Sequence, residues 1–478
     1  MFKKCAVAAV IAVLVTTSPF AQDAKTVVAN ASKAMGADTL RSVQYTGAGY
    51  DFAFGQAYSP TSPWPKFTVK SYTRSIDFER PASQATRVRT QFENPPRGGG
   101  QQPLAGEQTQ NQTIVVGPNT PWAQQLEILV TPHGFLRAAA TKPATMRTQT
   151  TGGKRYTVVT FTGDNKAQVN GYINDQNLVE RVETRIDNPM LGDMLYESVY
   201  SDYKDYNGVK FPSHIVQSQG GSPILDLTVS DVKPNAAAAI QPQAGPGGQP
   251  PANAPDGAVP TEKIADGVYL IRGAGAISLA FDFKDYAVIM EGPGDEVRGE
   301  AVIAETKKLI PNKPIRYLIN THHHFDHSSG LRPFVAEGAT IVTHQVNKAW
   351  FEKVLASPRT LNPDRQQQLK KKVTVEAVDD KKVLTDGNQV IELYHIRGNG
   401  HNAGLLFAYL PKQKILIQAD MLGVPMPNAP LAVNSYGQNF LMNLERLKLD
   451  VAMMVPIHLP ATAKPVMWAD LMKSVGTR

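Results

Sequence analysis

The sequence predicts two domains of different class, an α+β domain built on an antiparallel sheet and a C-terminal α/β domain. The chain has 478 residues, and domains typically span roughly 100–200 residues. Residues 241–260 hold six prolines and four glycines in 20 positions, a composition typical of a linker. Apolar residues mostly alternate before this segment and switch between strand and helix periodicity after it. We therefore expect domains at residues 22–240 and 261–478, the second folding without the first.

The N-terminal domain is predicted to be a curved antiparallel sheet with helices on its concave side. Helical spacing begins at Thr26, and the segment from Gln124 indicates one or two further helices. The glycine-rich stretch from Arg97 is predicted to be a long mobile loop. Strands are expected at the alternating runs SVQYTGAGYDFAF, KFTVKSYTRSIDF, ATRVRTQF, RYTVVTFTG, LVERVETRI, LYESVYSDY and ILDLTVSDV.

This strand pattern, together with the phrase YSDYKDYNGVKFP, resembles the half-barrel of periplasmic lipoprotein carriers. The resemblance implies a partner for this domain, namely an envelope lipid or another hydrophobic ligand.

Residues 1–21 are predicted to be a signal peptide. Lys3 and Lys4 precede an apolar run from Cys5 to Val15, and a small residue, Ala21, follows where cleavage is expected. This run is too short for a membrane span, which needs about 20 residues. We therefore expect a periplasmic or secreted protein with no integral membrane span.

Composition excludes several classes of function. Hydrophobic residues make up 42% of the chain, enough for a sizeable core, and the net charge of +7 is spread without a basic block. Nucleic acid is therefore not an expected partner. The only cysteine, Cys5, lies in the predicted signal peptide. The remaining chain has no disulfide, thiol nucleophile or thiolate metal ligand, so any metal must be bound by His, Asp or Glu.

Histidines concentrate in the C-terminal half, where eight of the ten lie between His322 and His458. His322 and His324 follow the apolar strand IRYLIN and point the same way in an extended segment, so both can reach one ion. Asp326 and His327 come next and can bind a second ion close by. Imidazole and carboxylate ligands suit a borderline divalent metal, zinc first among them.

Three further groups lie where strands meet loops, which is where a rigid scaffold presents functional side chains. His401 is in the glycine-rich turn GNGHN, Asp420 ends the strand KILIQAD, and His458 follows the strand VAMMVPI. The H-x-H-x-D-H motif and these three residues, in this order, resemble the metallo-β-lactamase superfamily from about Thr261 onward.

The resemblance implies a four-layered αβ/βα sandwich that carries two zinc ions at one edge. His322, His324 and His401 would bind the first ion; Asp326, His327 and His458 would bind the second; and Asp420 would bridge them. A hydroxide shared by the ions would attack the substrate, with Asp326 handling its proton. The implied protein is a metal-dependent hydrolase of small molecules that cleaves an ester, lactone or amide-like bond.

Two alternatives remain open at this point. The superfamily includes a mononuclear iron dioxygenase for persulfides, although Asp326, His327 and His458 together favour two metals. The redox branch with a di-iron site typically has Glu at the position of His324, so the histidine here argues against that branch. The second alternative is a lipid-binding or hydrophobic-ligand-binding envelope protein with an accessory hydrolase domain.

The other polar candidates are expected to have supporting roles. His323 is predicted to pack in the core or to contact the metal ligands without binding metal itself. His344 is predicted to contact the ligands in the same way or to lie in the core. Structural roles are expected for His133, His214 and His395. Tyr436 and Asn434, in the loop of residues 421–438 after the bridging aspartate, are candidate donors to an oxyanion.

Overall fold

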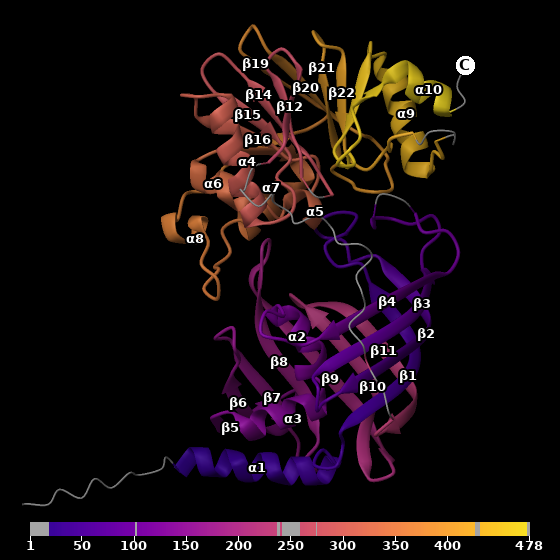
Figure 1. Ribbon diagram of the computed structural model, residues 1–478, viewed down its shortest axis with the longest axis vertical. Helices are drawn as coiled ribbons and strands as arrows, with labels where there is room; N and C mark the ends of the chain where they lie inside the picture. The colour runs from indigo at the N-terminus through magenta and orange to yellow at the C-terminus, as the bar shows by residue number, and fades with distance from the viewer. Residues whose placement is uncertain are drawn as a thin grey trace, which may run out of the picture.

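The computed structural model describes residues 19–100, 103–236, 240, 259–273, 275–425 and 431–475. Two domains lie one above the other along the long axis of the molecule (Figure 1). Most of the predicted signal peptide and residues 241–258 of the predicted linker lie outside the described residues. Export and the linker therefore stay predictions.

The N-terminal domain contains an antiparallel sheet of 11 strands in the order β4-β3-β2-β1-β11-β10-β9-β8-β7-β6-β5. It curves around helices α2 (Trp122–Leu129) and α3 (Pro132–Thr141) (Figure 1), so the predicted architecture is confirmed. The strands are β1 Ser42–Phe52, β2 Lys66–Asp77, β3 Ala82–Gln91, β4 Gln108–Val115, β5 Ala144–Thr151, β6 Lys154–Thr162, β7 Gln168–Ile173, β8 Val179–Asn188, β9 Gly192–Tyr206, β10 Val209–Gln219 and β11 Ser222–Pro234.

A tight turn fixes the register between β9 and β10. Tyr206 pairs with Val209 across a two-residue turn made by Asn207 and Gly208, which both have positive φ, 56° and 83°. An Asn-Gly turn of this kind matches the twist of antiparallel strands. The stretch from Arg97 differs from its prediction, because its last residues enter β4 and pair with β3.

Three helices cover the sheet: α1 Pro19–Met35, α2 Trp122–Leu129 and α3 Pro132–Thr141. The described part of α1 includes the periodic residues from Thr26, as predicted. The segment from Gln124 makes two helices, because α2 ends at Leu129 and Thr131 caps the start of α3. The Thr131 hydroxyl accepts a hydrogen bond from Gly134 N.

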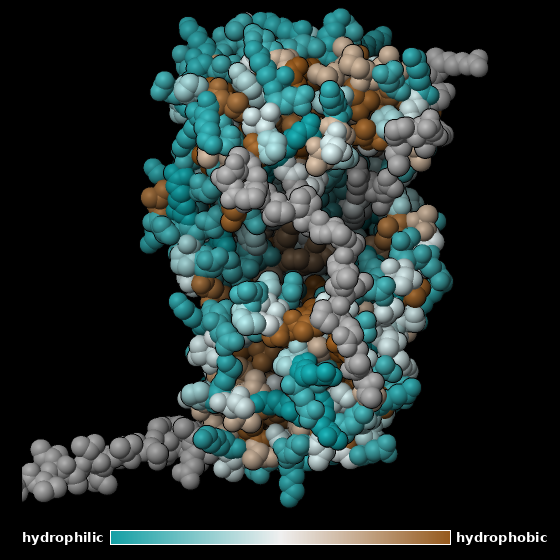
Figure 2. All heavy atoms as spheres, viewed as in Figure 1, coloured by the Kyte–Doolittle hydropathy of each residue, from teal (hydrophilic) through white to brown (hydrophobic). Residues whose placement is uncertain are grey.

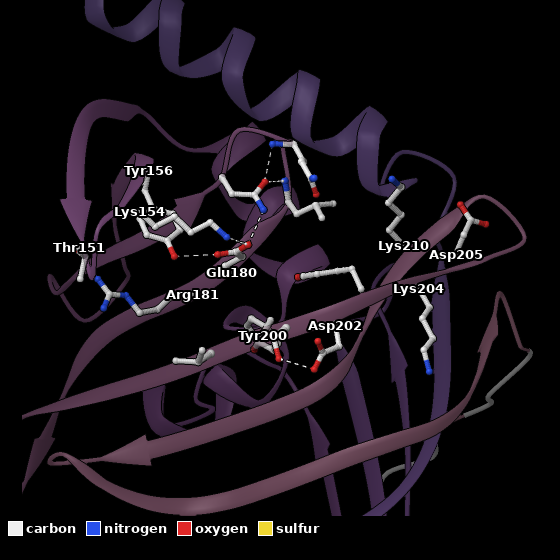
Figure 3. A pocket seen from close by; sticks show the side chains of 16 residues that line it. Thr151, Lys154, Tyr156, Glu180, Arg181, Tyr200, Asp202, Lys204, Asp205 and Lys210 are labelled. Carbon is white, nitrogen blue, oxygen red and sulfur yellow. Dashed lines mark hydrogen bonds and ion pairs between the residues drawn. The ribbon is translucent and has the colours of Figure 1, made fainter.

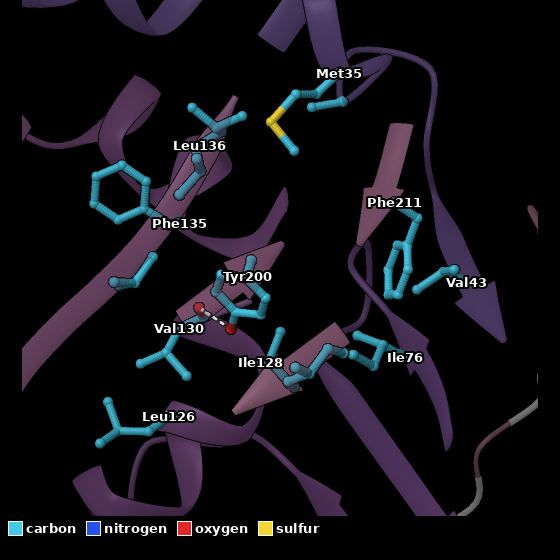
Figure 4. Close-up of a cluster of buried hydrophobic side chains, with 14 of the residues drawn as sticks. Met35, Val43, Ile76, Leu126, Ile128, Val130, Phe135, Leu136, Tyr200 and Phe211 are labelled. Atoms are coloured by element: carbon cyan, nitrogen blue, oxygen red, sulfur yellow. Dashed lines mark hydrogen bonds between the residues drawn. The ribbon is translucent and has the colours of Figure 1, made fainter. Parts of the chain in front are cut away.

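Side chains fill the concave interior of the N-terminal domain (Figure 4). Phe135, Leu126 and Val130 are fully buried there, and the Tyr200 hydroxyl donates to Val130 O at 2.7 Å. The space in which a carrier would hold a lipid is thus part of a packed core. The predicted envelope-lipid or hydrophobic ligand is not supported.

An open cavity of about 740 Å³ lies elsewhere on this domain (Figure 3). Its lining includes Lys154, Glu180, Arg181 and Asp202. Glu180 is engaged by Lys154 and by the Tyr156 hydroxyl, the latter at 2.9 Å. The cavity is therefore polar, and its charged groups are partly paired with one another.

The C-terminal domain is a sandwich of two mixed sheets, as predicted. The first sheet has seven strands in chain order and the second has six. The first contains β12 Thr261–Ala265, β13 Val268–Ile271, β14 Ser278–Asp282, β15 Ala287–Met290, β16 Ile315–Ile319, β17 Thr340–His344 and β18 Val375–Val378. The second contains β19 Lys381–Thr385, β20 Val390–His395, β21 Leu406–Leu410, β22 Ile415–Gln418, β23 Met453–Pro456 and β24 Val466–Met467.

Helices cover the outer faces of both sheets. Phe334 and Phe351, from α6 Arg332–Glu337 and α7 Gln345–Val354, pack on the first sheet with α4 Glu296–Leu309. Phe440 of α9 Ser435–Leu447 packs on the second sheet with α10 Trp468–Val475. Two short helices, α5 Phe325–Ser328 and α8 Arg365–Leu369, complete the domain.

No helix in the described parts of the chain is both long and apolar enough to cross a membrane.

Candidate metal centre

The predicted ligands converge at one edge of the sandwich. β16 ends at Ile319, and His322 and His324 follow in extended backbone before α5 brings Asp326 and His327 back toward them. His401 comes from the turn between β20 and β21. Asp420 and His458 follow β22 and β23, which are parallel neighbours. The carboxyl ends of parallel strands meet at one edge, which explains how residues so distant in sequence come together.

The seven side chains form two groups that share one carboxylate. His322, His324 and His401 offer nitrogens within 4.8 Å of one another, and so do the ligand atoms of Asp326, His327 and His458. The closest nitrogen pairs are His322 Nε2–His401 Nε2 at 3.3 Å and His327 Nε2–His458 Nε2 at 3.1 Å.

Asp420 lies between the two groups. Its Oδ2 is 3.4 Å from Nε2 of both His322 and His401 and 2.9 Å from His327 Nε2. Its Oδ1 is 3.0 Å from His458 Nε2. The residue has a φ of 65°, a costly conformation for a non-glycine residue that aims the carboxylate into the cluster.

The electrostatics of the cluster favour bound cations. Burial, followed by the neighbouring His327, holds the pKa of His322 well below its ordinary value. Burial and His401 do the same to the pKa of His324. Burial alone would raise the pKa of Asp420, but His327 and His401 hold it well below its ordinary value. Burial alone would lower the pKa of His327 and His458 as well, but the adjacent Asp420 carboxylate holds both above their ordinary value. The site thus combines neutral imidazoles at His322 and His324 with an ionised buried carboxylate that attracts positive charge.

A divalent metal fits this arrangement. Imidazole nitrogens 3.1–3.3 Å apart are close enough to share either a proton or a metal cation. Oδ2 of Asp420 is buried and has no hydrogen-bond partner among the described residues. Nitrogen and carboxylate donors of this kind suit zinc and similar ions.

A buried glutamate that the sequence analysis missed supports the second group. Glu291 follows β15 and is fully buried. Its Oε2 accepts from His327 Nδ1 at 2.8 Å, and its Oε1 accepts from Thr321 N at 2.7 Å. His327 Nδ1 therefore carries the proton, and Nε2 is left for a metal. The signal was present in YAVIMEG, where an acid ends an apolar strand as Asp420 does.

Partners from the N-terminal domain also reach three of the proposed ligands. Ala57 O accepts from His324 Nε2 at 2.9 Å, and Gly100 O accepts from His401 Nδ1 at 3.2 Å. Gln56 Nε2 donates to Asp326 Oδ1 at 2.9 Å. Backbone carbonyls have no sequence signature, so no pattern could have revealed the first two. These bonds place groups of both domains around the same ligands, and independent folding of the second domain stays a prediction.

The remaining histidines have other partners. His323 is buried beside Trp350, with ring centroids 5.4 Å apart, and its Nδ1 is 3.1 Å from Asn402 Nδ2. His344 caps α7, and its ring is tilted against that of His395 with centroids 4.0 Å apart. In the N-terminal domain, His133 stacks on Phe211, and His214 pairs with Asp226.

The two candidate oxyanion donors have structural partners instead. The buried Tyr436 hydroxyl donates to Gly98 O at 3.1 Å. Asn434 caps α9, its side chain accepting from Tyr436 N and Gly437 N. The Tyr436 ring also lies beside the proposed ligand His401, with centroids 5.5 Å apart. The oxyanion role of the two residues stays a prediction.

Comparison with known proteins identifies the C-terminal domain. Residues 287–459 match the family model of the metallo-beta-lactamase superfamily. No curated protein sequence matches the chain.

Several solved structures resemble 46% of the chain. A metallo-beta-lactamase from Pontibacter korlensis is 18% identical and is covered over 98% of its length, with a TM-score of 0.35. The DIM-1 metallo-beta-lactamase is 16% identical and covered over 96%, with a TM-score of 0.34. The flavodiiron protein from Giardia intestinalis is 14% identical and covered over 58%, with a TM-score of 0.34. At these TM-scores none of the three carries an argument about activity. By the family match and the two-sheet sandwich, residues 287–459 of this chain form a metallo-β-lactamase superfamily domain.

Proposed function

We propose that this protein is an exported, dinuclear zinc-dependent hydrolase that cleaves an ester, lactone or amide-like bond in a small molecule. The position of Asp420 supports the two-ion proposal most strongly. Its Oδ2 is 3.4 Å from Nε2 of both His322 and His401 in one group and 2.9 Å from His327 Nε2 in the other. Its Oδ1 is 3.0 Å from His458 Nε2 in that second group. A carboxylate in that position is suited to bridging two cations.

Under this proposal, His322, His324 and His401 hold one ion, and Asp326, His327 and His458 hold the other. Two zinc ions would supply Lewis acidity at the scissile carbonyl and would lower the pKa of a water toward about 7. The chain itself positions these ligands through Glu291 and through Gly275 O, which accepts from His458 Nδ1 at 2.7 Å.

Asp326 is the group best placed to meet substrate and to move a proton. Its side chain is 46% exposed, whereas that of His458 is 22% exposed and that of Asp420 is 3% exposed. Its Oδ1 accepts from Gln56, and its Oδ2 lies 3.5 Å from His327 Nε2. The carboxylate is thus oriented at the open side of the cluster, where it can take a proton from an attacking water and deliver it to a leaving group.

The test is a hydrolysis screen of the full chain loaded with zinc. Lactones, esters, thioesters, β-lactams and phosphodiesters are offered with and without a chelator, and a His322→Ala variant is the matched control. We expect turnover of a carbonyl ester, lactone or amide that the chelator abolishes and zinc restores. Hydrolysis of none of these substrates by fully loaded protein, or persulfide oxidation by a form with one iron, would overturn the proposal.

A further inference from the structure

Two loops of the N-terminal domain lie against the metal cluster. The first is residues 53–65, between β1 and β2, and the second is residues 92–107, between β3 and β4, described except for 101–102. In Figure 1 this end of the N-terminal domain reaches the edge of the C-terminal domain near α5. The surface is hollowed between the domains on the face shown in Figure 2, and apolar residues appear in the hollow.

The loops make matched polar contacts with the segments that carry the ligands. Gly55 O accepts from Phe325 N at 3.1 Å, between His324 and Asp326. Gly98 N donates to Gly400 O at 2.9 Å, next to His401. Tyr58 O accepts from Ala403 N at 2.8 Å. These backbone bonds fix where the loop carbonyls lie relative to the ligand histidines.

The carbonyl partners determine which nitrogen of each histidine is free. A carbonyl oxygen only accepts, so His324 carries its proton on Nε2, toward Ala57 O, and keeps the Nδ1 lone pair. His401 carries its proton on Nδ1, toward Gly100 O, and keeps the Nε2 lone pair, which faces His322. Two of the three histidines of the first group thus depend on the other domain for their tautomer and ring orientation.

Close packing holds the loops in place. Gly55 has a φ of 80°, and a Cβ there would lie 2.6 Å from Phe325 Cγ. Gly98 has a φ of 72°, and a Cβ there would lie 2.5 Å from Gln56 O. Phe325 also packs edge-on against Phe54, with ring centroids 5.2 Å apart. Neither glycine can gain a side chain without moving the loop that carries the hydrogen-bonding groups.

A separate contact keeps the two domains aligned. Arg359, in the C-terminal domain, is almost fully buried. Its Nε donates to Asp187 Oδ1 of β8 at 2.7 Å, and its Nη1 donates to Asp364 Oδ2 at 3.0 Å. Nearby, Thr360 N donates to Asp193 Oδ2 of β9 at 2.9 Å. The loops at the metal cluster are therefore not the sole attachment between the domains.

We infer that the N-terminal domain is part of the metal centre, with residues 55–57 and 98–100 acting as positioning elements for His324, His401 and Asp326. This inference rests on the two-ion proposal above. It assigns the domain a role in metal affinity and ligand geometry that residues 261–478 do not provide alone.

The test is a zinc titration of the full chain in competition with a chromophoric chelator. Gly55→Ala and Gly98→Ala displace the loops, and Gln56→Ala removes only the amide that orients Asp326. Gly117→Ala is the matched control, because Gly117 lies in the same domain with an ordinary φ and open space around a Cβ. We expect the three test variants to lose about 10- to 100-fold in affinity for at least one ion, and the control to match the parent.

Thermal unfolding of the metal-free proteins shows which variants are folded, and Gln56→Ala, which introduces no clash, decides the test if either glycine variant is not. Parental affinity for both ions in every folded test variant would overturn this inference alone. A parent chain that binds no zinc would instead overturn the proposed function.

Discussion

Replacing Glu291 by glutamine tests whether the buried carboxylate controls the metal affinity of the second group. The two oxygens of Glu291 accept from His327 Nδ1 at 2.8 Å and from Thr321 N at 2.7 Å. Glutamine has nearly the same shape but offers one acceptor and one donor, so one of these N–H groups would face an NH₂. A buried donor left unsatisfied costs about 1–3 kcal/mol.

The mismatch is expected to weaken metal binding. If His327 moved its proton to Nε2 to satisfy the amide, it would lose the lone pair that a metal needs. At about 1.4 kcal/mol per factor of ten, the penalty corresponds to roughly a 10- to 100-fold loss of zinc affinity, the range typical of changes behind a metal ligand. We expect this loss in the ion held by His327.

Chelator-competition titration of the Glu291→Gln variant measures the effect directly. Glu305→Gln is the control, since it removes the same charge from α4, where Glu305 pairs with Lys308. Zinc affinities equal to the parent's for both ions, in a folded Glu291→Gln protein, would refute the assigned role of Glu291.

Three further predictions concern proton transfer, domain alignment and acid stability. Asp326→Asn should lower kcat by about 10²- to 10⁴-fold with little change in substrate binding. A parental kcat at full zinc content would show that Asp326 binds metal but does not transfer a proton. Arg359→Met should destabilise the folded chain by about 1–3 kcal/mol in urea unfolding, because buried Asp364 and the β8 carboxylate of Asp187 lose a partner; an unchanged midpoint would contradict the contact. Burial lowers the pKa of His133 from 6.5 to about 4, so the unfolded chain takes up a proton that the folded chain refuses. The free energy of unfolding is therefore unaffected by His133 above pH 6.5. It falls by about 3 kcal/mol as the pH falls from 6.5 toward 4. His133→Gln should flatten urea-derived stability over this range relative to the parent, and an unchanged pH dependence would contradict it.

The ligand cluster was predictable because metal ligands are side chains, whose type and spacing can be read from the sequence. His322, His324, Asp326 and His327 are close in sequence, and the later ligands each follow an apolar strand. The same logic would have found Glu291. The contribution of the N-terminal domain was not predictable, because Ala57 and Gly100 act through backbone carbonyls that every residue possesses.

The fold shows a similar division. The predicted strands alternate because one face of the sheet is buried, as in β9. The missed strands include β4 and β5, which lie at opposite edges of the sheet. Their sequences, QTQNQTIV and ATMRTQTT, are largely polar and exposed, as edge strands often are to avoid pairing with other chains. Such strands lack the apolar alternation on which a sequence-based prediction depends.

Metal analysis of the purified parent protein beside His322→Ala and His458→Ala tests the central claim most directly. The two substitutions remove one ligand from each group on either side of Asp420. We expect about two zinc ions per parent chain, as in two-metal hydrolytic sites, and the loss of close to one equivalent in each variant. One metal or none in the parent, or unchanged zinc in both variants, would contradict a dinuclear centre at these residues.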